Sequence, residues 1–399
     1  MTRTKLSRDW VLQMGLQTAR AGWALLIMLM MAATVARPAA AQTFSVLHEF
    51  AGVPNDGSGP RGGLVRDAAG NFFGTTFTGG SNSEGTIFKL TPAGQESVLL
   101  TFNTSNGSFP ASGLLLDRAG NLFGTADEGP GGAGVLFRLA KDGTEVTFHA
   151  FQGGQNSEAA LPAGGVITDA AGNLYGATLL GGLGFGVVYQ VDPTGTLKVL
   201  YDFKGQADGA EPQGPLVRDA DGNLYGAALQ GGAHHAGTIF KLAGNGTLTV
   251  LHSFSGGRDG GAPQGGLLRD GAGNLFGSAF TGGDTGNGTV FEITKIGSFR
   301  RLHSFTGAAD GTNPNGALIR DSDGNIYGTA QLGGLQGLGT VFKLSRTGEL
   351  TVLHTFTGDL DGATPFSGLI RDAAGHLFGT AEQNFLLQQR GGNVFKITP

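Results

Sequence analysis

The stretch Asp169–Val191, DAAGNLYGATLLGGLGFGVVYQV, combines short apolar runs with many glycines. The apolar runs are typical of β-strands, but glycine weakens a strand because it loses the most backbone freedom on folding. Glycine in such a place usually marks a tight turn or a close approach by a neighbouring group. The stretch therefore predicts two strands, with glycines in the connections and at one closely packed strand position, Gly176.

The start of this stretch occurs seven times along the chain. Each copy has the pattern D-x-x-G-N or D-x-x-G-H, followed by an apolar residue, an aromatic residue and a glycine. Such regularity indicates one repeating structural unit rather than several unrelated domains. The copies are spaced by 50 to 52 residues and begin at Asp67, Asp117, Asp169, Asp219, Asp270, Asp321 and Asp372.

Each copy contains four short apolar runs bounded by glycine, aspartate or asparagine. In the fifth copy these are residues 265–270, 274–279, 288–294 and 298–305. Runs of this kind predict strands, and no stretch beyond residue 41 shows a convincing helical period. Four strands in a unit of about 50 residues is the size of a β-propeller blade.

The two ends of the chain split one repeat between them. Residues 43–50, TFSVLHEF, match a fourth strand without the three before it, and residues 392–399, GNVFKITP, match a third strand without the fourth after it. Pairing the two would complete a seventh blade and leave no open edge. The sequence therefore predicts an all-β fold, a seven-bladed β-propeller over residues 42–399, closed by its N-terminal strand.

The repeat resembles the GloVer tandem repeat of choice-of-anchor proteins. The shared features are the D-x-x-G-N turn, the LHSF strand and the GTVFKL strand, and the likeness covers residues 43–399. The resemblance implies an exported bacterial protein and assigns no biochemical function.

Residues 1–41 have the plan of a secretory signal peptide. Basic residues precede the apolar run 21–36, and Ala39 and Ala41 are the small residues expected before a cleavage site. We expect cleavage after Ala41, export to the periplasm or the medium, and no stable membrane span afterwards; an uncleaved membrane anchor is the alternative. The chain has no cysteine, so an exported protein of this sequence is held together without disulfides.

The charge balance argues against nucleic acid as a partner. The first 41 residues hold five of the 26 basic and one of the 31 acidic residues, which leaves a formal charge of −9 on the rest. Nucleic-acid binding needs basic residues that neutralise phosphates. We expect a monomeric protein whose partner is an extracytoplasmic protein or polysaccharide.

Two repeated polar positions have structural explanations. Five histidines share one place in the fourth strand, and because leucine and tyrosine stand there in other copies we expect packed or hydrogen-bonded side chains. Five arginines precede the turn aspartate; an ion-pair network is the favoured interpretation and a ring that binds an anion is the alternative. The two sets are His48, His149, His252, His303 and His354, and Arg66, Arg218, Arg269, Arg320 and Arg371.

The sequence predicts no metal site and no cofactor. The turns 219–223 and 321–325 resemble the start of a calcium loop, but they lack the distal glutamate that such a loop requires. Calcium stays open as an alternative.

Candidate binding residues are those that depart from the repeat in the loops, because a binding or catalytic site needs a few unlike residues that converge. The seventh loop is the strongest candidate, since it carries three adjacent apolar residues. No nucleophile–base or metal motif appears, so we expect a non-catalytic binding module. The alternative is a polysaccharide lyase or hydrolase, or a lactonase-like enzyme, with its site on the loop face. The candidates are Glu84, Asp127, Glu128, His234, His235, Asp284, Glu382, Phe385, Leu386, Leu387 and Arg390.

Overall fold

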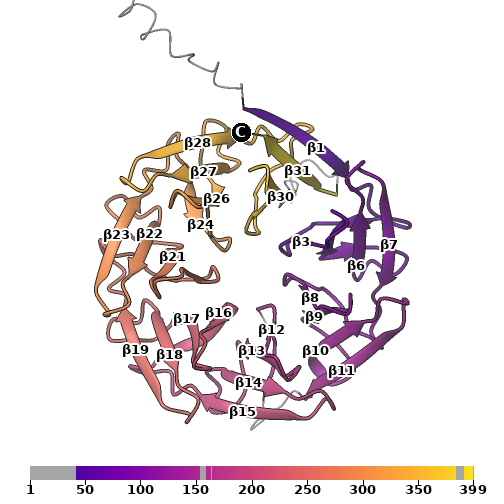
Figure 1. Cartoon of the computed structure of the whole chain (residues 1–399), viewed down its shortest axis with the longest axis horizontal. Coiled ribbons are helices and arrows are strands. Elements are labelled where there is room, and N and C mark those ends of the chain that lie inside the picture. The colour runs from indigo at the N-terminus through magenta and orange to yellow at the C-terminus, as the bar shows by residue number, and fades with distance from the viewer. Residues whose placement is uncertain (1–41, 153–158, 163, 383–390, 399) are drawn as a thin grey trace, which may run out of the picture. The chain divides into compact units, whose positions relative to one another are not determined.

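The computed structural model describes residues 42–152, 159–162, 164–382 and 391–398. Seven small antiparallel sheets stand side by side in a ring, and each sheet is one blade (Figure 1). The predicted seven-bladed propeller is therefore confirmed. The predicted signal peptide and the candidates Phe385, Leu386, Leu387 and Arg390 lie outside the described residues. Within the described part of the chain, no helix is long and apolar enough to cross a membrane.

The blades follow one another in chain order, and each runs from an innermost to an outermost strand. Blade 1 consists of β3 (Val65–Arg66), β4 (Phe72–Thr76), β6 (Thr86–Leu90) and β7 (Glu96–Thr101). Blade 2 consists of β8 (Leu115–Leu116), β9 (Leu122–Ala126), β10 (Gly132–Leu139) and β11 (Glu145–Gln152). Blade 3 consists of β12 (Ile167–Thr168), β13 (Leu174–Thr178), β14 (Val187–Val191) and β15 (Leu197–Asp202).

Blades 4 to 6 repeat this plan. Blade 4 has β16 (Ala210–Arg218), β17 (Leu224–Gln230), β18 (Thr238–Leu242) and β19 (Leu248–Ser253). Blade 5 has β20 (Leu268–Arg269), β21 (Leu275–Ala279), β22 (Thr289–Ile293) and β23 (Phe299–Ser304). Blade 6 has β25 (Ile319–Arg320), β26 (Ile326–Leu332), β27 (Thr340–Leu344) and β28 (Leu350–Thr355), with the short β24 (Thr312–Pro314) also on β26. A two-stranded pair, β2 (Gly57–Ser58) and β5 (Thr78–Gly79), lies beside blade 1.

Blade 7 is built from both ends of the chain. Its order is β29 (Ile370–Arg371), β30 (Leu377–Ala381), β31 (Asn393–Thr398) and then β1 (Thr43–Glu49). The ring of Phe44 on β1 stacks on the ring of Phe395 on β31, with 5.4 Å between centroids. The predicted closure by the N-terminal strand is therefore confirmed.

The glycine inside the second strand is required by an aromatic ring on the third. In blade 5, Gly277 is paired with Phe291, and a Cβ added to Gly277 would lie 2.5 Å from a ring carbon of Phe291. The other six blades have the same pair with the same close approach. The turn glycines are also explained: Gly273 has φ +92°, and the turn is held by Asp270, whose carboxylate accepts from the amide of Asn274 at 2.8 Å.

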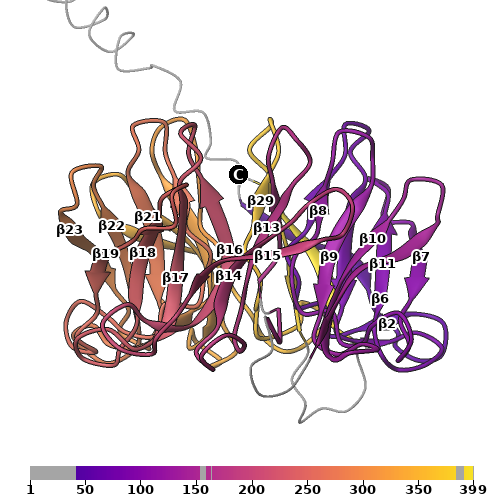
Figure 2. The ribbon, with the colours of Figure 1, turned by 90° about the horizontal axis from the view of Figure 1, so that it is seen from below.

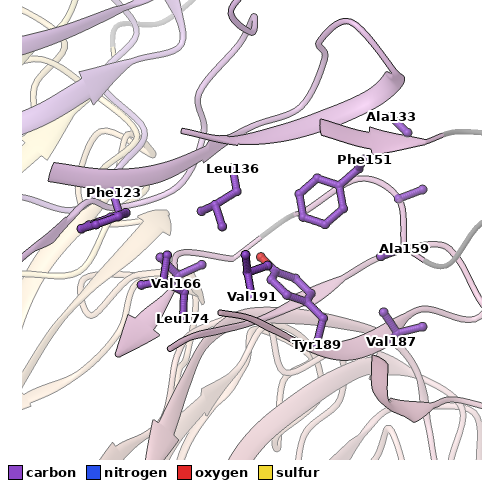
Figure 3. Close-up of a cluster of buried hydrophobic side chains, with 11 residues drawn as sticks. Phe123, Ala133, Leu136, Phe151, Ala159, Val166, Leu174, Val187, Tyr189 and Val191 are labelled. Atoms are coloured by element: carbon purple, nitrogen blue, oxygen red, sulfur yellow. The ribbon is translucent and has the colours of Figure 1, made fainter. Parts of the chain in front are cut away.

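Apolar side chains fill the space between neighbouring blades. Figure 3 shows the contact between blades 2 and 3, where Phe151 faces Tyr189 with 5.4 Å between ring centroids. The Tyr189 hydroxyl is buried and has no hydrogen-bond partner, and burial raises the pKa of this side chain. A phenylalanine fills the equivalent place in every other blade: Phe88, Phe137, Phe240, Phe291, Phe342 and Phe395.

In blades 4 to 6 the strand histidine is hydrogen-bonded to the aspartate of the next loop. His149 differs, because its Nδ1 lies 3.2 Å from the carbonyl oxygen of Gly195. His252 Nε2 lies 3.0 Å from Asp259 Oδ2, and the same pair recurs in blades 5 and 6 at 3.1 and 3.0 Å. The same aspartates accept from backbone amides, for example Asp259 from Ser255 at 3.0 Å. In these three blades the pair therefore fastens the next loop to the strand before it.

The arginines near the turns contact the preceding blade. Arg320 Nη1 donates to Asp270 Oδ2 at 2.8 Å, and the Arg320 guanidinium lies 5.0 Å from the ring centroid of Phe276. Arg218 lies similarly over Tyr175, at 5.7 Å. The ion-pair interpretation holds for Arg320, but its partner is the aspartate one blade back rather than the adjacent one.

Candidate functional site

The two faces of the ring differ in what they present. One face carries short turns, and the other carries the longer loops between the second and third strands and between successive blades. This second face, which we call the loop face, lies at the bottom of Figure 2, where β2 is found. Its inner rim is formed by residues at the loop-face ends of the two innermost strands. At the end of the second strand or directly after it, these are Phe77, Asp127, Leu179, Leu229, Phe280, Gln331 and Glu382.

Arg61 is the centre of a polar and aromatic cluster on this rim. Its Nε and Nη2 donate to Glu382 Oε1 at 3.1 and 2.9 Å. Its guanidinium lies 4.0 Å from the ring centroid of Phe77 and 5.8 Å from that of Phe366. Glu382 is only 7% exposed, so this charged pair is largely removed from water. Closure of the ring brings the pair together, because Arg61 belongs to blade 1 and Glu382 to blade 7.

Asp127 brings blade 2 into the same cluster. Burial raises the pKa of Asp127 to about 6, while the charge of Arg61 opposes this rise and the charge of Glu128 adds to it. The ring of Phe109, in the loop before β8, lies 5.3 Å from the ring of Phe77. We call the six residues of this site the rim cluster: Arg61, Phe77, Phe109, Asp127, Phe366 and Glu382.

Two further predicted acids border the rim cluster. Glu84 Oε2 accepts a hydrogen bond from Ser108 Oγ at 2.8 Å. Ser108 exchanges backbone hydrogen bonds with Glu128 at 3.1 and 3.2 Å, and Glu128 is exposed. The structure therefore gathers four of the predicted acids, Glu84, Asp127, Glu128 and Glu382, where blades 7, 1 and 2 meet.

The backbone beside the rim has an unusual conformation before one proline in each loop that leads into a blade, which we call the loop proline. The residue before the proline is a glycine in the loop into blade 1, but six other residue types stand there elsewhere, all with φ between 49° and 60°. Such a left-handed conformation costs about 1 to 3 kcal/mol for a residue other than glycine. Six different side chains are therefore accepted in this conformation. The six residues are Phe109, Leu161, Glu211, Ala262, Asn313 and Thr364.

Comparison with known protein families gives one clear result. The Gloeobacter/Verrucomicrobia repeat matches residues 33–228, 125–279 and 216–399, which together span nearly the whole chain. The chain belongs to the Gloeobacter/Verrucomicrobia repeat family. The expected GloVer resemblance is thereby confirmed. No curated protein matches this repeat protein.

Solved structures share the fold of this repeat protein at low sequence identity. Two are of the extracellular domain of one B. thetaiotaomicron protein, named in one case as a one component system and in the other as a hybrid two component system. They show TM-scores of 0.55 and 0.57 and identities of 10% and 16% over 87% and 90% of this chain. The chain covers only 39% and 42% of their length. A gluconolactonase from Xanthomonas campestris matches at 14% identity over 92% of both chains, but its TM-score of 0.46 supports no argument.

The structure separates the remaining described candidates from the rim cluster of this GloVer protein. His234 and His235 are exposed in the loop after β17 of blade 4. Asp284, in blade 5, is an exposed surface group that pairs with Arg258 at 2.9 Å and with Arg301 at 2.8 Å. These three residues do not form part of one site with the four acids.

Four members of the rim cluster were missed by the sequence prediction: Arg61, Phe77, Phe109 and Phe366. Two of them, Arg61 and Phe366, share one repeat position. Both directly follow a loop proline, at a position that resembles ordinary repeat sequence. A signal was present, because Arg61 is the only charged residue and Phe366 the only aromatic residue at this position. The other copies have Ala111, Ala163, Gln213, Gln264 and Asn315 there.

Proposed function

We propose that this protein is an exported, non-catalytic binding module that holds a neutral or cationic polysaccharide on its loop face, at the rim cluster. The observation that carries the proposal is the convergence of Arg61, Glu382 and Asp127 with three phenylalanine rings from three blades. The fold does not need these residues, since other blades have leucine or glutamine in the same places.

The chemistry of the rim cluster suits a sugar polymer. Carboxylates accept hydrogen bonds from hydroxyl groups, the remaining Arg61 donors can reach ring or hydroxyl oxygens, and phenylalanine faces pack against sugar C–H groups. The charge of Arg61 is already neutralised by Glu382. The nearby carboxylates of Glu84 and Glu128 therefore give the surface around the rim cluster a net negative charge. This balance, and the charge of −9 on residues 42–399, disfavour a polyanion.

Export is supported by the signal-like residues 1–41 and by the extracellular location of the two B. thetaiotaomicron domains. We propose the periplasm or the medium as its compartment and a monomer as its working state.

A second candidate function rests on Asp127. A carboxyl group whose pKa is raised to about 6 can act as a general acid near neutral pH, as in enzymes that cleave glycosidic bonds. On this alternative, Asp127 would protonate the leaving oxygen, and one of the neighbouring carboxylates would serve as the base. The protein would then be a polysaccharide hydrolase or lyase.

One set of titrations separates the two functions. Calorimetry with soluble β-glucan, chitosan oligomers and polygalacturonate should show binding to the neutral or cationic polymers, and Arg61→Gln should weaken it at least tenfold. The substituted glutamine is already present at this position in blades 4 and 5. Arg258→Gln removes an arginine–aspartate pair elsewhere and should leave binding unchanged.

Incubation of the protein with the same polymers, followed by analysis of the products, distinguishes binding from catalysis. The binding proposal expects no new reducing ends or unsaturated products after long incubation. Product release that is abolished by Asp127→Leu and depends on a group with a pKa near 6 would establish the enzyme instead. Equal binding by the wild type and Arg61→Gln would rule out the rim cluster as the site.

A further inference from the structure

The histidine–aspartate pair at the contact between blades 7 and 1 differs from the pairs in blades 4, 5 and 6. Between blades 4 and 5 the pair is a hydrogen bond of 3.0 Å, and the ring of Phe299, at the start of β23, stacks on His252 at 3.8 Å. The contact between blades 6 and 7 is the same, with Phe44 stacked on His354 at 3.8 Å. An apolar side chain thus covers each of these histidines.

At the contact between blades 7 and 1, Glu96 replaces that apolar cover. His48 lies on β1, Asp56 in the loop into blade 1, and Glu96 at the start of β7, which meets β1 at the outer edge of the ring (Figure 1). His48 Nε2 lies 3.5 Å from Asp56 Oδ2, longer than the pair in blades 4 to 6. The distance between histidine and aspartate is therefore longer at the pair that has a second carboxylate, that of Glu96, beside it.

Two buried polar atoms at this place lack hydrogen-bond partners. They are His48 Nε2 and Glu96 Oε1, and burying such atoms without a partner is unfavourable. Burial and the nearby charge of Asp56 also raise the pKa of Glu96. A protein that places leucine or phenylalanine at this position in five of seven blades does not need a carboxyl group here for packing.

We infer that His48, Asp56 and Glu96 form a binding site for one divalent transition-metal ion of the Zn²⁺ type, which fastens the closing strand β1 to blade 1. One donor atom from each residue lies within 4.8 Å of the others. Zinc binds imidazole nitrogen and carboxylate oxygen at about 2.0 to 2.2 Å, so its ligands lie about 3.4 Å apart in tetrahedral geometry. The three ligand atoms therefore need to move closer to one another by little more than an ångström to bind the ion.

The surroundings hold two of the three ligands in place. The carboxylate of Asp56 accepts from the backbone amides of Ala51 at 2.7 Å and Gly57 at 2.6 Å, which leaves further lone pairs for an ion. The ring of His48 packs edge-to-face on Phe50 at 4.7 Å. Supports of this kind orient metal ligands and lower the cost of assembling them. One imidazole and two carboxylates favour Zn²⁺ over hard ions such as Ca²⁺.

The repeat itself supplies substitutions that the fold accepts. Glu96→Leu introduces the residue found in blades 3, 4 and 6, and His48→Tyr introduces the residue of blade 3, whose Tyr201 hydroxyl donates to Asp208 at 3.0 Å. Glu145→Leu is the matched control, because Glu145 stands at the same position of blade 2 beside Leu100 and Asn106 rather than histidine and aspartate.

The experiment is a Zn²⁺ titration of untagged protein, followed by calorimetry and by the thermal unfolding midpoint. All proteins carry His234→Ala and His235→Ala, which removes the exposed histidine pair as a competing site. We expect one equivalent of Zn²⁺ to bind and to raise the midpoint by a few degrees. Glu145→Leu should leave both unchanged, whereas Glu96→Leu and His48→Tyr should each weaken binding at least tenfold and abolish the shift.

Two results would overturn the site. One is the absence of saturable Zn²⁺ binding to the parent protein, and the other is equal binding by the parent and Glu96→Leu. A stabilisation by Ca²⁺ that persists in His48→Tyr would also overturn it, since the imidazole would then have no part in the binding. Loss of polysaccharide binding by Arg61→Gln is measured separately and is independent of these outcomes.

Discussion

Two arcs of the ring carry different residues at the same repeat positions. The regular arc, blades 4 to 6, has Leu229, Phe280 and Gln331 on the rim and an intact histidine–aspartate pair in each blade. The seam arc, blades 7, 1 and 2, has Asp127 and Glu382 on the rim, and carboxylates at the start of two outer strands.

The regular arc shows what the fold requires, and the seam arc shows what has been added to it. Leu229 and Phe299 are apolar side chains and bring no charge to their places. Charged groups at the matching positions of the seam arc must be desolvated, which is unfavourable unless a partner or ligand compensates. The carboxylates at these matched positions of the seam arc are therefore the departures from the repeat to test for function.

The largest effect is expected from breaking the seam arc at its closing strand. Removing residues 42–49 deletes β1 and exposes the edge of β31. The loss of Phe44 and Leu47 from the core should destabilise the protein by more than about 5 kcal/mol, since single large core truncations cost about 2 to 5 kcal/mol each.

Denaturant unfolding and solubility measure this effect against the protein that begins at Gln42. An unchanged midpoint after the deletion would mean that β1 contributes nothing to closure, and the distinction between the arcs would lose its structural basis.

The second largest effect on stability is expected from Asp127. The blades of the regular arc have an apolar or amide side chain at this position. Burial raises the pKa of Asp127 from its usual value of 3.8 to about 6 in the folded protein. At a pH between these two values the folded protein therefore keeps this carboxyl group protonated, whereas the unfolded chain does not. The free energy of unfolding therefore falls as the pH rises from about 4 to 6. At pH 7 the ionised Asp127 lowers it by the full amount, about 3 kcal/mol. Asp127→Leu should recover about this amount at pH 7 and flatten the pH dependence of unfolding between about pH 4 and 6.

The converse substitution, Leu229→Asp in the regular arc, serves as the control. It should destabilise the protein at pH 7 and introduce a similar pH dependence. If Asp127→Leu instead destabilises the protein at pH 7, the carboxylate is stabilised by its surroundings and the desolvation argument is wrong.

A third, smaller effect tests whether every departure from the repeat is functional. The Tyr189 hydroxyl in blade 3 is buried without a partner, and phenylalanine stands in all other copies. Tyr189→Phe should stabilise the protein by about 1 kcal/mol, because an unsatisfied buried polar group is removed. Thermal unfolding measures this gain, and ligand binding should not change. A loss of stability would reveal a partner for the hydroxyl, and Phe240→Tyr should show the opposite sign.

The smallest effect is expected at Asp284, the exposed acid of blade 5. Its pairs with Arg258 and Arg301 lie at the surface, where ion pairs contribute little. Asp284→Asn should leave the unfolding midpoint and polymer binding unchanged within error. A clear loss of binding would extend the site into the regular arc and remove the distinction between the two arcs.

The fold could be predicted because its determinants are local and repeated. The spacing of residues in the sequence reveals three of these determinants. They are the turn built on Asp270, the glycine that faces Phe291, and the seventh blade that is split between the two ends of the chain. The histidine–aspartate bonds were within reach too, since His252 and Asp259 are seven residues apart, as are the pairs in blades 5 and 6. The histidines were expected to be packed or hydrogen-bonded, but their aspartate partner was not predicted, because each of the two positions has an ordinary structural explanation by itself.

The rim cluster could be predicted only in part. The acids stood out as departures from the repeat, but Arg61 and Glu382 are 321 residues apart and meet only because the ring closes. The raised pKa of Asp127 depends on how deeply its side chain is buried, which the sequence does not state. The contact of Glu96 with His48 likewise requires the placement of β1 beside blade 1.

The left-handed residue before each loop proline has a consequence for how such a protein can change over time. Its shape is held by backbone bonds, as in the amide of Glu211 to the carbonyl of Phe185 at 2.8 Å and that of Asn313 to Asn287 at 2.9 Å. The frame therefore accepts side chains as different as Phe109 and Ala262. Recombination between copies of matching length can move one of these side chains to another blade in register. The side chains of the rim can thus change one blade at a time, while the propeller that carries them stays the same.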